Sequence, residues 1–523
     1  MKKVYSIILF IAIAINTNAQ APLIKWEKSF GGSSDETAFV VRQTYDAGYI
    51  VLGQANSTDG DLAGELGGYW LIKLDSTGAI QWQQCYDGGG SYLNSLDITS
   101  DHGYVIAGGV GRPQISGILD FNFGIIKIDS IGTIQWTKSL GGSDIDFANS
   151  IKQTKDGGYI AAGISKSNNG DVSGHHGDTL TYDYWIVKLD SSANIQWQKS
   201  YGGVSSYCGS DSDDGAYVVR QTKDGGYIAA GYTYSNNDDV SGNHGGSDYW
   251  IIKLDTVGSL LWQKCLGGSG NDYAYSLEPT LEGGFIVAGS TNSYNGDITS
   301  YQGNQDAWVV KLDSIGNIQW QNSMGGSSDD CAKSVKQTSD GGFIVTGGTL
   351  SNDGEVLGNH GNYDCWVIKL DSSGIIQWQK TLGGTQQDFA NSVEQTNDRS
   401  YILTGGSLSN DGDVTGHHGT YWYADCWVVK LDTVFATAIT EINNQQSSIH
   451  ISPNPTTSVF SISSLEEKII EIEIHNIVGE LIYKTSTTTP QTTIDLSKQP
   501  KGIYFVQVTD TNKNVTNKKI IMQ

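Results

Sequence analysis

Six loops of one repeating pattern, close to SNDGDVSGNHG, place carboxylates and amides on both sides of a glycine. Hard oxygen ligands on a flexible backbone are what Ca²⁺ requires, so these loops are candidate calcium sites. Asn and Asp also dominate turns because they hydrogen-bond to nearby backbone, and the spacing does not match the twelve-residue EF-hand loop. The pattern therefore favours structural turns and leaves calcium binding open. The candidate calcium ligands are Asp59, Asp61, Asp171, Asp238, Asp239, Asp297, Asp353, Glu355, Asp411 and Asp413.

The same loops hold six of the nine histidines. The adjacent pair His417 and His418 has zinc-binding side chains, but zinc needs three or four converging ligands and successive repeats hold these loops apart. Hydrogen-bonded or solvent-facing histidines are therefore the favoured interpretation. Trp422 lies in the aromatic segment after this pair, and the faces of aromatic rings stack on sugars. Trp422, His417 and His418 are the candidate ligand contacts.

No arrangement typical of a catalytic centre stands out in the sequence. It contains no nucleophile elbow, no HExxH, no P-loop, and no GxGxxG between a strand and a helix. The Lys of each Lys-(Leu/Ile)-Asp copy and the Asp of most DxA copies recur once per repeat. A catalytic residue breaks repeat symmetry, so paired or hydrogen-bonded structural roles are predicted for both.

The composition of the chain restricts which partners and which type of structure are expected. The chain has 523 residues with 56 acidic and 32 basic side chains, for a formal charge of −24. This acidity argues against nucleic acid and anionic lipid as partners through bulk charge. Glycine is frequent at 66 residues, proline is scarce at 7, and aromatic residues reach 10%. This composition predicts turn-rich β structure, and the length predicts several domains or a repeat array.

One unit of about 59 residues recurs seven times, and residues 318–371 are typical of it. Each unit contains four strand-like runs, of the form IQWQKS, AxSVxQT, GGYIVAG and YWVVKLD, separated by glycine-rich turns typical of hairpins. Four antiparallel strands per repeat at this period predict a β-propeller. The tryptophans of the first run are Trp26, Trp82, Trp136, Trp197, Trp262, Trp320 and Trp378.

Residue size predicts the order of the strands. The AxSVxQT run has the smallest residues, as a crowded inner strand should, so the order outward is AxSVxQT, GGYIVAG, YWVVKLD, IQWQKS. The array then begins with an orphan outer strand at residues 23–30 and ends with a unit that lacks one, near 426–432. We therefore predict an all-β fold, a seven-bladed β-propeller of four-stranded blades closed by the N-terminal strand beside that of Trp427. Closure removes sheet edges that invite aggregation.

The repeat resembles bacterial propeller-repeat families with the pattern W…LGGSxxDxAxxV…DGGxxVAGxT, and residues 262–291 match it most fully. The resemblance extends over the predicted propeller, residues 20–432, and implies a fold rather than an activity. Thirteen of the fourteen tryptophans occupy two fixed strand positions, which predicts packing between blades. Departures from the repeat, such as an insertion at Ser205–Asp214, are where a specific site could lie, although sequence drift explains them more simply.

Residues 1–19 have the form of a cleaved signal peptide. Lys2 and Lys3 precede about 12 apolar residues, and small residues end the segment before Gln20. Because a bilayer span requires roughly 20 apolar residues, no transmembrane anchor is expected. Six cysteines follow without a CxxC motif. Export permits disulfides, but mostly free, buried thiols are predicted.

The composition changes after Asp432. Residues 433–449 are predicted to be a linker, and residues 450–523 contain some seven short strand-like runs, which predicts a small β-sandwich. This segment resembles the type A C-terminal sorting domains of the type IX secretion system of Bacteroidota. The motifs that carry the resemblance are SPNP at 452–455, HNIVGE at 475–480, IDLS at 494–497, GIYFV at 502–506 and KKII at 518–521.

The resemblance implies export across the outer membrane by the type IX machinery and removal of residues 450–523 at the surface. The favoured function is therefore a monomeric, secreted or cell-surface propeller that binds a glycan or a surface protein without catalysis. An extracellular polysaccharide-acting enzyme is the alternative, and it would need two carboxylates about 5–10 Å apart. A quinone-dependent dehydrogenase ranks below it. KLDSxGxIQW resembles the strand–turn–Trp of those propellers, but their adjacent cysteine pair is missing.

Overall fold

The computed structural model describes most of the chain. The described ranges are 21–65, 67–86, 92–113, 119–177, 181–204, 213–419, 422–432, 449–464, 469–476, 481–487, 489, 491–511 and 515–522. The predicted signal peptide at 1–19, Cys208, most of the insertion at 205–214 and most of the linker at 433–449 lie outside them. Backbone contacts divide the chain into two compact units, Met1–Phe435 and Ala436–Gln523. No helix in the described ranges is long and apolar enough to cross a membrane.

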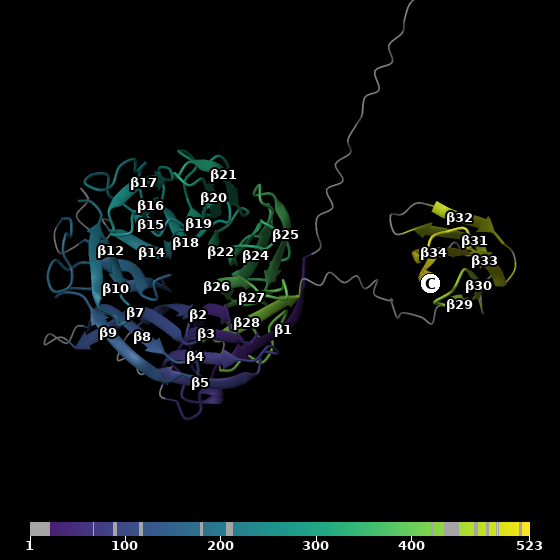
Figure 1. The fold of residues 1–523 in the computed structure, drawn as a ribbon, viewed down its shortest axis with the longest axis horizontal. Coiled ribbons are helices and arrows are strands. Elements are labelled where there is room, and N and C mark those ends of the chain that lie inside the picture. Colours follow the sequence, from purple (N-terminus) through teal and green to yellow (C-terminus); the bar gives the residue numbers. More distant parts are fainter. Residues whose placement is uncertain are drawn as a thin grey trace, which may run out of the picture. The chain divides into compact units, whose positions relative to one another are not determined.

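Seven four-stranded antiparallel sheets make up the first unit, and Figure 1 shows them arranged around a common centre. The short 3-10 helix η1 (Gly60–Leu62) interrupts one loop. The all-β prediction with four strands to each repeat is confirmed, and so is the predicted strand order. The first three sheets are β2 (Glu36–Gln43), β3 (Tyr49–Ala55), β4 (Gly68–Leu74), β5 (Ile80–Tyr86); β6 (Tyr92–Ile98), β7 (Tyr104–Pro113), β8 (Leu119–Ile128), β9 (Ile134–Leu140); and β10 (Asp146–Gln153), β11 (Tyr159–Ser165), β12 (Asp183–Leu189), β13 (Ile195–Tyr201).

The next sheets repeat this order, with the first strand of each nearest the centre in Figure 1. The fourth to sixth sheets are β14 (Asp214–Gln221), β15 (Tyr227–Thr233), β16 (Asp248–Leu254), β17 (Leu260–Leu266); β18 (Asp272–Pro279), β19 (Phe285–Thr291), β20 (Asp306–Leu312), β21 (Ile318–Met324); and β22 (Asp330–Gln337), β23 (Phe343–Thr349), β24 (Asp364–Leu370), β25 (Ile376–Leu382). Each sheet therefore presents the AxSV-type strand inward, as residue size predicted.

The seventh sheet takes its fourth strand from the start of the chain. It contains β26 (Asp388–Gln395), β27 (Tyr401–Ser407), β28 (Asp425–Asp432) and, beside β28, β1 (Leu23–Phe30). Trp26 lies opposite Lys430, so the predicted pairing of these two strands is present. The first and seventh sheets also touch directly, since the Asn391 side chain donates a hydrogen bond to the Ala38 carbonyl at 2.9 Å.

Turn chemistry explains where the strands reverse. The Asp75 carboxylate accepts the backbone N–H groups of Thr77 (2.8 Å) and Ala79 (3.0 Å), which closes the turn from the third strand to the outer strand. The neighbouring Lys73 is buried, and its ammonium donates to Asp46 at 2.8 Å. The structural role predicted for the repeated Lys is therefore confirmed. The turn recurs at Asp129, Asp190, Asp255, Asp313 and Asp371.

Aromatic side chains join each sheet to the next. Tyr184 packs against Trp250 of the following sheet with ring centroids 4.5 Å apart, and its hydroxyl donates to the Trp250 carbonyl at 2.8 Å. The indole N–H of Trp250 donates to Gln263 at 3.0 Å. These contacts confirm the predicted packing of fixed-position tryptophans. The tryptophans buried in this way are Trp70, Trp185, Trp250, Trp308, Trp366 and Trp427.

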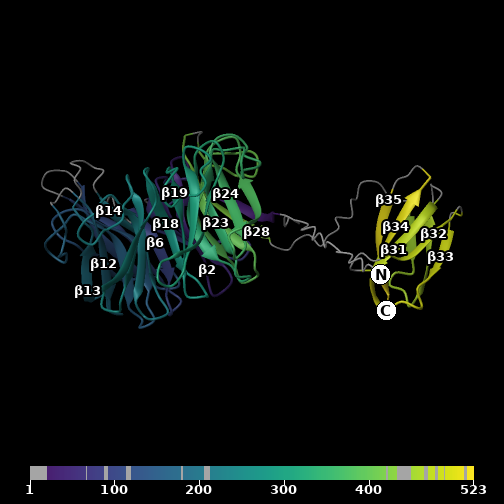
Figure 2. The same ribbon diagram turned by 90° about the horizontal axis from the view of Figure 1, so that it is seen from above.

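The second unit has two sheets that share one apolar core (Figure 2). Phe460 and Ile494 from one sheet pack with Ile474 and Val506 from the other. The two sheets have the orders β29-β30-β33 and β32-β31-β34-β35. Their strands are β29 (Ile449–Ser452), β30 (Val459–Ser464), β31 (Ile469–Asn476), β32 (Leu481–Ser486), β33 (Gln491–Asp495), β34 (Gly502–Asp510) and β35 (Val515–Met522).

Candidate functional site

The predicted calcium ligands bind the backbone of a neighbouring segment. Asp59 accepts the backbone N–H of Ser33 at 2.7 Å, and Asp61 accepts that of Gly31 at 3.1 Å. The crossover segments, such as residues 31–35, thus meet the loops between second and third strands at one end of the sheets, which we call the crossover end. The same contacts recur for Asp171, Asp297, Asp353, Glu355 and Asp411.

The fourth sheet varies this arrangement. Asn237 stands at the position of Asp59, as Asn169 and Asn295 do in the third and fifth sheets, and accepts the backbone N–H of Val204 at 2.7 Å. Asp238 stands where the other copies have glycine, and its φ of 52° lies in the left-handed region that Asp tolerates. Asp239 lies 3.7 Å from the Nε2 atom of His176. The loop acids of this sheet therefore also have local structural contacts.

Hydrogen bonds from the crossover segments lower the pKa of three of these loop carboxylates. The backbone N–H of Ser33 holds the pKa of Asp59 below its usual range, and equivalent hydrogen bonds lower the pKa of Asp353 and of Asp411. Asp413 is equivalent to Asp61, and its own N–H donates to a crossover carbonyl. Across the described ranges, no group of three or more His, Cys, Asp or Glu side chains could hold a metal ion. The contacts support structural turns, and calcium binding stays a prediction.

Four of the loop histidines are hydrogen-bonded to buried aspartates. His418 Nδ1 lies 2.9 Å from Asp425, and its Nε2 lies 3.8 Å from Asp61 of the first sheet. His417 is buried beside the same Asp425, whereas Trp422 is 78% exposed. Of the three predicted ligand contacts, Trp422 therefore presents the most surface to solvent. The other histidines in the His418 position are His176, His244 and His360.

Buried carboxylates meet in pairs between neighbouring sheets. In each pair, one acid begins a third strand and the other begins the inner strand of the next sheet. A Cβ atom placed on Gly267 would lie 2.7 Å from Asp248 Oδ1 and closer still to Asp272 Oδ2, so the two side chains converge on this glycine. We call these the inter-sheet carboxylate pairs. They are Asp183/Asp214, Asp248/Asp272, Asp306/Asp330, Asp364/Asp388 and Asp425/Glu36, and all ten residues are 0% exposed.

Proximity and burial favour a neutral member in each pair. Burial raises the pKa of Asp248 to about 7, the charge of Asp272 adds to this, and hydrogen bonds from His244 oppose it. Burial likewise raises the pKa of Asp214 to about 7, with Asp183 adding. Two carboxylates in a dry interface do not both ionise readily, so the second proton of a pair is harder to remove than the first. One oxygen of the third-strand acid has no hydrogen-bond partner among the described residues in Asp183, Asp248, Asp306, Asp364 and Asp425.

In the second sheet, an uncharged amide replaces one carboxyl group of the pair. Asn122 stands at the third-strand position, and its Oδ1 converges with Asp146 Oδ2 on Gly141, where a Cβ atom would lie 2.7 Å from Asn122 Oδ1. A neutral amide is thus accepted where other sheets have a carboxyl group. Because the carboxylate pairs are fully buried, they do not provide the accessible pair that polysaccharide hydrolysis requires.

A second set of charges lies on the inner strands, at the variable position of SVxQT. Lys152 pairs with Asp97 of the preceding sheet at 2.5 Å, and both Arg220 (2.9 Å) and Lys336 pair with Glu278. Burial alone would raise the pKa of Glu278, but Arg220 and Lys336 hold it well below its usual range. These ion pairs link the inner strands of neighbouring sheets. The full set is Arg42, Asp97, Lys152, Arg220, Glu278, Lys336 and Glu394.

Five tyrosines of the fourth and fifth sheets form one aromatic cluster near the crossover end. Tyr217 of β14 lies 5.4 Å, between ring centroids, from both Tyr232 and Tyr275. Tyr232 lies 5.2 Å from Tyr273, and the hydroxyls of Tyr273 and Tyr234 are 2.7 Å apart. All five are half-buried. We call Tyr217, Tyr232, Tyr234, Tyr273 and Tyr275 the tyrosine cluster.

The tyrosine cluster breaks the repeat symmetry that the other contacts keep. Tyr217 and Tyr275 occupy a position that is Phe39 in the first sheet, Asn149 in the third, Lys333 in the sixth and Asn391 in the seventh. This cluster was not predicted from the sequence, because the repeats were compared only for the residues that they share. Comparing equivalent inner-strand positions across repeats would have revealed tyrosines concentrated in two neighbouring copies.

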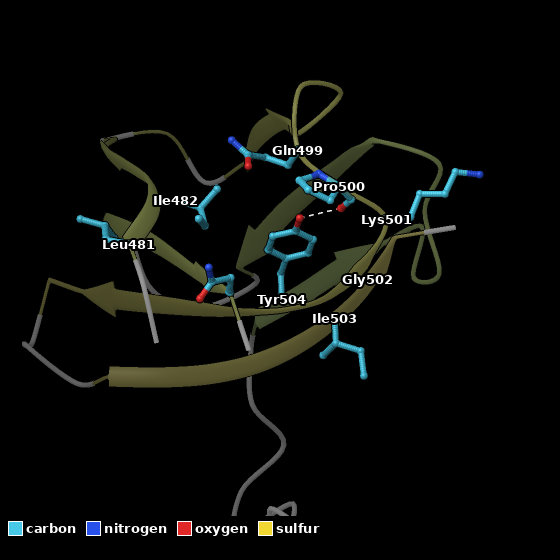
Figure 3. A pocket seen from close by; sticks show the side chains of 9 residues that line it. Leu481, Ile482, Gln499, Pro500, Lys501, Gly502, Ile503 and Tyr504 are labelled. Carbon is cyan, nitrogen blue, oxygen red and sulfur yellow. Dashed lines mark hydrogen bonds between the residues drawn. The ribbon is translucent and has the colours of Figure 1, made fainter. Parts of the chain in front are cut away.

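The second unit carries a pocket of about 580 Å³ at one end of β32 and β34 (Figure 3). The hydroxyl of Tyr504 donates to the Pro500 carbonyl at 2.6 Å, which joins β34 to the segment before it. Leu481 and Ile503 also line the pocket and are largely exposed. The pocket is therefore formed by the sequence motif GIYFV at 502–506 and its neighbours.

Comparison with known families identifies the second unit. Residues 450–523 match the family described as the secretion system C-terminal sorting domain. This segment is a type IX sorting domain. Such a domain directs export, so the protein reaches the cell surface or the extracellular space. The predicted sorting domain at residues 450–523 and the predicted location are confirmed, whereas the type A class and the Bacteroidota origin stay predictions.

Two curated proteins share shorter stretches with the chain. The regulatory protein FlaEY of Caulobacter vibrioides is 29% identical over 150 residues, which cover 26% of this chain and 15% of that protein. An endo-acting ulvan lyase of Formosa agariphila is 29% identical over 114 residues, which cover 22% of each protein. Because the chain spans less than a quarter of either relative, their functions are not transferred.

Solved structures show a distant likeness. The WD40 domain of Pan2 from Neurospora crassa is 9% identical, with 77% of this chain and 97% of that chain covered and a TM-score of 0.41. The extracellular domain of BT4673 from B. thetaiotaomicron is 10% identical, with 93% and 69% covered and a TM-score of 0.31. At these scores the likeness adds nothing to the fold described above.

Proposed function

We propose that the protein is a non-catalytic binding protein of the cell surface or extracellular space, built on a closed seven-bladed β-propeller and exported by the type IX machinery. The sorting domain supports export, and the pairing of β1 with β28 supports closure. The tyrosine cluster carries the binding proposal because it is a half-buried aromatic site that interrupts an otherwise repeated structure. The contacts that recur from sheet to sheet, by contrast, join structural partners.

Export is tested in a bacterium that has a type IX system. Mass spectrometry of the mature protein should show a start at Gln20 and loss of residues 450–523. A chain that ends before residue 450 should stay in the periplasm, while a chain with Trp422→Ala, outside the sorting domain, should be secreted normally. Secretion of the truncated chain would contradict the proposed role of the sorting domain.

Binding is tested with the purified secreted protein on an array that carries glycans and peptides. The proposal expects specific signals that a double variant, Tyr217→Leu with Tyr273→Leu, loses. Tyr45→Leu is the matched control, since Tyr45 is an exposed tyrosine at the hairpin between β2 and β3. Signals that both variants retain would place binding elsewhere, and an empty array would count against the binding function itself.

A further inference from the structure

Two tyrosine rings near the crossover end, one of them in the tyrosine cluster, already contact lysine ammonium groups. The Lys333 ammonium of the sixth sheet lies 3.6 Å from the ring centroid of Tyr275. In the third sheet, the Lys166 ammonium lies 4.0 Å from the ring centroid of Tyr182. The face of a tyrosine ring attracts positive charge through its quadrupole. Rings near the crossover end therefore have the geometry to bind ammonium groups at two separate places.

One acidic side chain lies close to these rings, and two more lie in the loop after Tyr234. Asp213 accepts the backbone N–H of Tyr182 at 3.0 Å. Burial raises the pKa of Tyr232, and the neighbouring Tyr217 and Asp213 raise it further, so the Asp213 charge is close to the cluster. Asp238 and Asp239 follow Tyr234 in the same loop. The cluster thus combines aromatic faces with negative charge, and each of these attracts cations.

We propose that the tyrosine cluster binds a lysine- or arginine-rich polypeptide segment. This inference rests on the proposed binding function and names the ligand of that site. A neutral sugar would gain hydrogen bonds from the acids but no charge attraction, whereas a cation is attracted by charge to the acids and to the ring faces. One cation–aromatic contact lies at Tyr182 in the third sheet, and the other lies at the cluster ring of Tyr275, which contacts Lys333 of the sixth sheet. A chain with several charges can occupy such a spread of positions, which a single small ion cannot.

The test measures fluorescence anisotropy of labelled hexalysine with the secreted protein. Hexalysine with acetylated side chains is the matched probe, because it has the same length and no side-chain charge. We expect at least tenfold weaker binding of the acetylated probe and weaker binding of hexalysine as salt increases. Tyr275→Leu and Tyr273→Leu should each weaken hexalysine binding about fivefold, and Tyr45→Leu should not.

A further variant gives the opposite expectation. Lys333→Ala removes the internal ammonium from the Tyr275 ring, so hexalysine should bind more tightly. The unfolding midpoint of every variant is measured so that loss of fold is not mistaken for loss of binding. Tighter binding in Lys333→Ala at an unchanged unfolding midpoint keeps the test informative if a tyrosine variant is unstable.

Other outcomes would overturn the inference in distinguishable ways. Hexalysine binding that salt abolishes but tyrosine variants leave unchanged would be bulk attraction to an acidic protein. Spermine that binds as tightly as hexalysine would identify a small polyamine as the ligand. A neutral oligosaccharide that binds through the tyrosines, without hexalysine binding, would refute the cationic ligand and leave the binding function intact. No tyrosine-dependent binding of any probe, together with an empty array, would refute both.

Discussion

At the scale of single residues, the first glycine of each described crossover leaves no space for a side chain. Two buried carboxylates converge on Gly267, and any Cβ there would lie under 3 Å from an oxygen of each. We expect Gly267→Ala to lower the free energy of unfolding by about 1–3 kcal/mol, the usual cost of overpacking. Urea denaturation of the purified protein measures the change.

Substitution of a second glycine separates the cost of a steric collision from the cost of backbone strain. Gly242 has a φ of 91°, but a Cβ placed on it meets no atom within 4 Å. Gly242→Ala therefore reports the cost of a left-handed alanine alone, whereas Gly267→Ala reports the collision. If Gly267→Ala proved as stable as the unchanged protein, the convergence of the two carboxylates on this glycine would be wrong.

The loop residues show which contacts could be predicted from single positions in the sequence. Asp and Asn flanking glycine predicted turns, and hydrogen bonds from crossover N–H groups to Asp59 and its equivalents bear this out. The carboxylate pairs could not be predicted in the same way. Asp248 and Asp272 belong to different sheets and meet only because neighbouring sheets pack together around one glycine. The tyrosine cluster likewise depends on contacts between sheets, which the sequence of one repeat does not contain.

At the scale of elements, the inter-sheet carboxylate pairs make stability depend on pH. The folded pKa of Asp248 is raised to about 7 from the usual value near 4. A raised pKa contributes stability that is full below the unfolded value and is lost as pH rises through the folded value. The pairs should therefore favour the folded state at about pH 4 relative to about pH 8. Lys–Asp pairs such as Lys253/Asp224 affect stability over a different pH range. The pKa of Asp224 is lowered to about 2, so the contribution of such a pair to stability is lost only below about pH 4.

Asp248→Asn tests this dependence by copying the natural amide at Asn122. The amide can donate toward Asp272 without holding a titrating proton, so the variant should lose part of the decline in stability between about pH 4 and pH 8. We expect it to be more stable than the unchanged protein at pH 8, on the order of 2 kcal/mol. Urea unfolding at about pH 4, 6 and 8 measures the effect.

The control concerns His244, whose Nδ1 lies 2.6 Å from the Asp248 carboxylate. His244→Gln places there the residue type that Gln302 supplies in the fifth sheet, where the Gln302 backbone N–H donates to Asp306. The pH dependence should survive His244→Gln and fall in Asp248→Asn. The reverse result would assign the dependence to the histidine and contradict a shared proton in the pair.

At the scale of the whole first unit, repetition made the fold predictable. Seven copies of four strands, each with its own turn residues, predicted the strand order that every sheet shows. The odd strand at the start and the missing strand at the end predicted the pairing of β1 with β28. Repetition could not predict the tyrosine cluster, because tyrosines on two inner strands alter neither the strands nor the turns of the repeat.

Removal of β1 tests whether this pairing closes a propeller. Without residues 21–30, β28 becomes an edge strand with unpaired backbone groups, and an exposed edge recruits other chains. Trp26 would also be lost from its contact with Tyr49 of the first sheet, where the ring centroids are 5.8 Å apart. We expect the shortened protein to melt at a lower temperature and to form oligomers in size-exclusion chromatography with light scattering. Replacing Leu23–Phe30 with the outer-strand sequence of Ile376–Leu382, extended by one residue, should restore a monomer because it restores the strand without the native sequence. A shortened protein that remains monomeric with an unchanged melting temperature would show that the ring of sheets does not depend on β1.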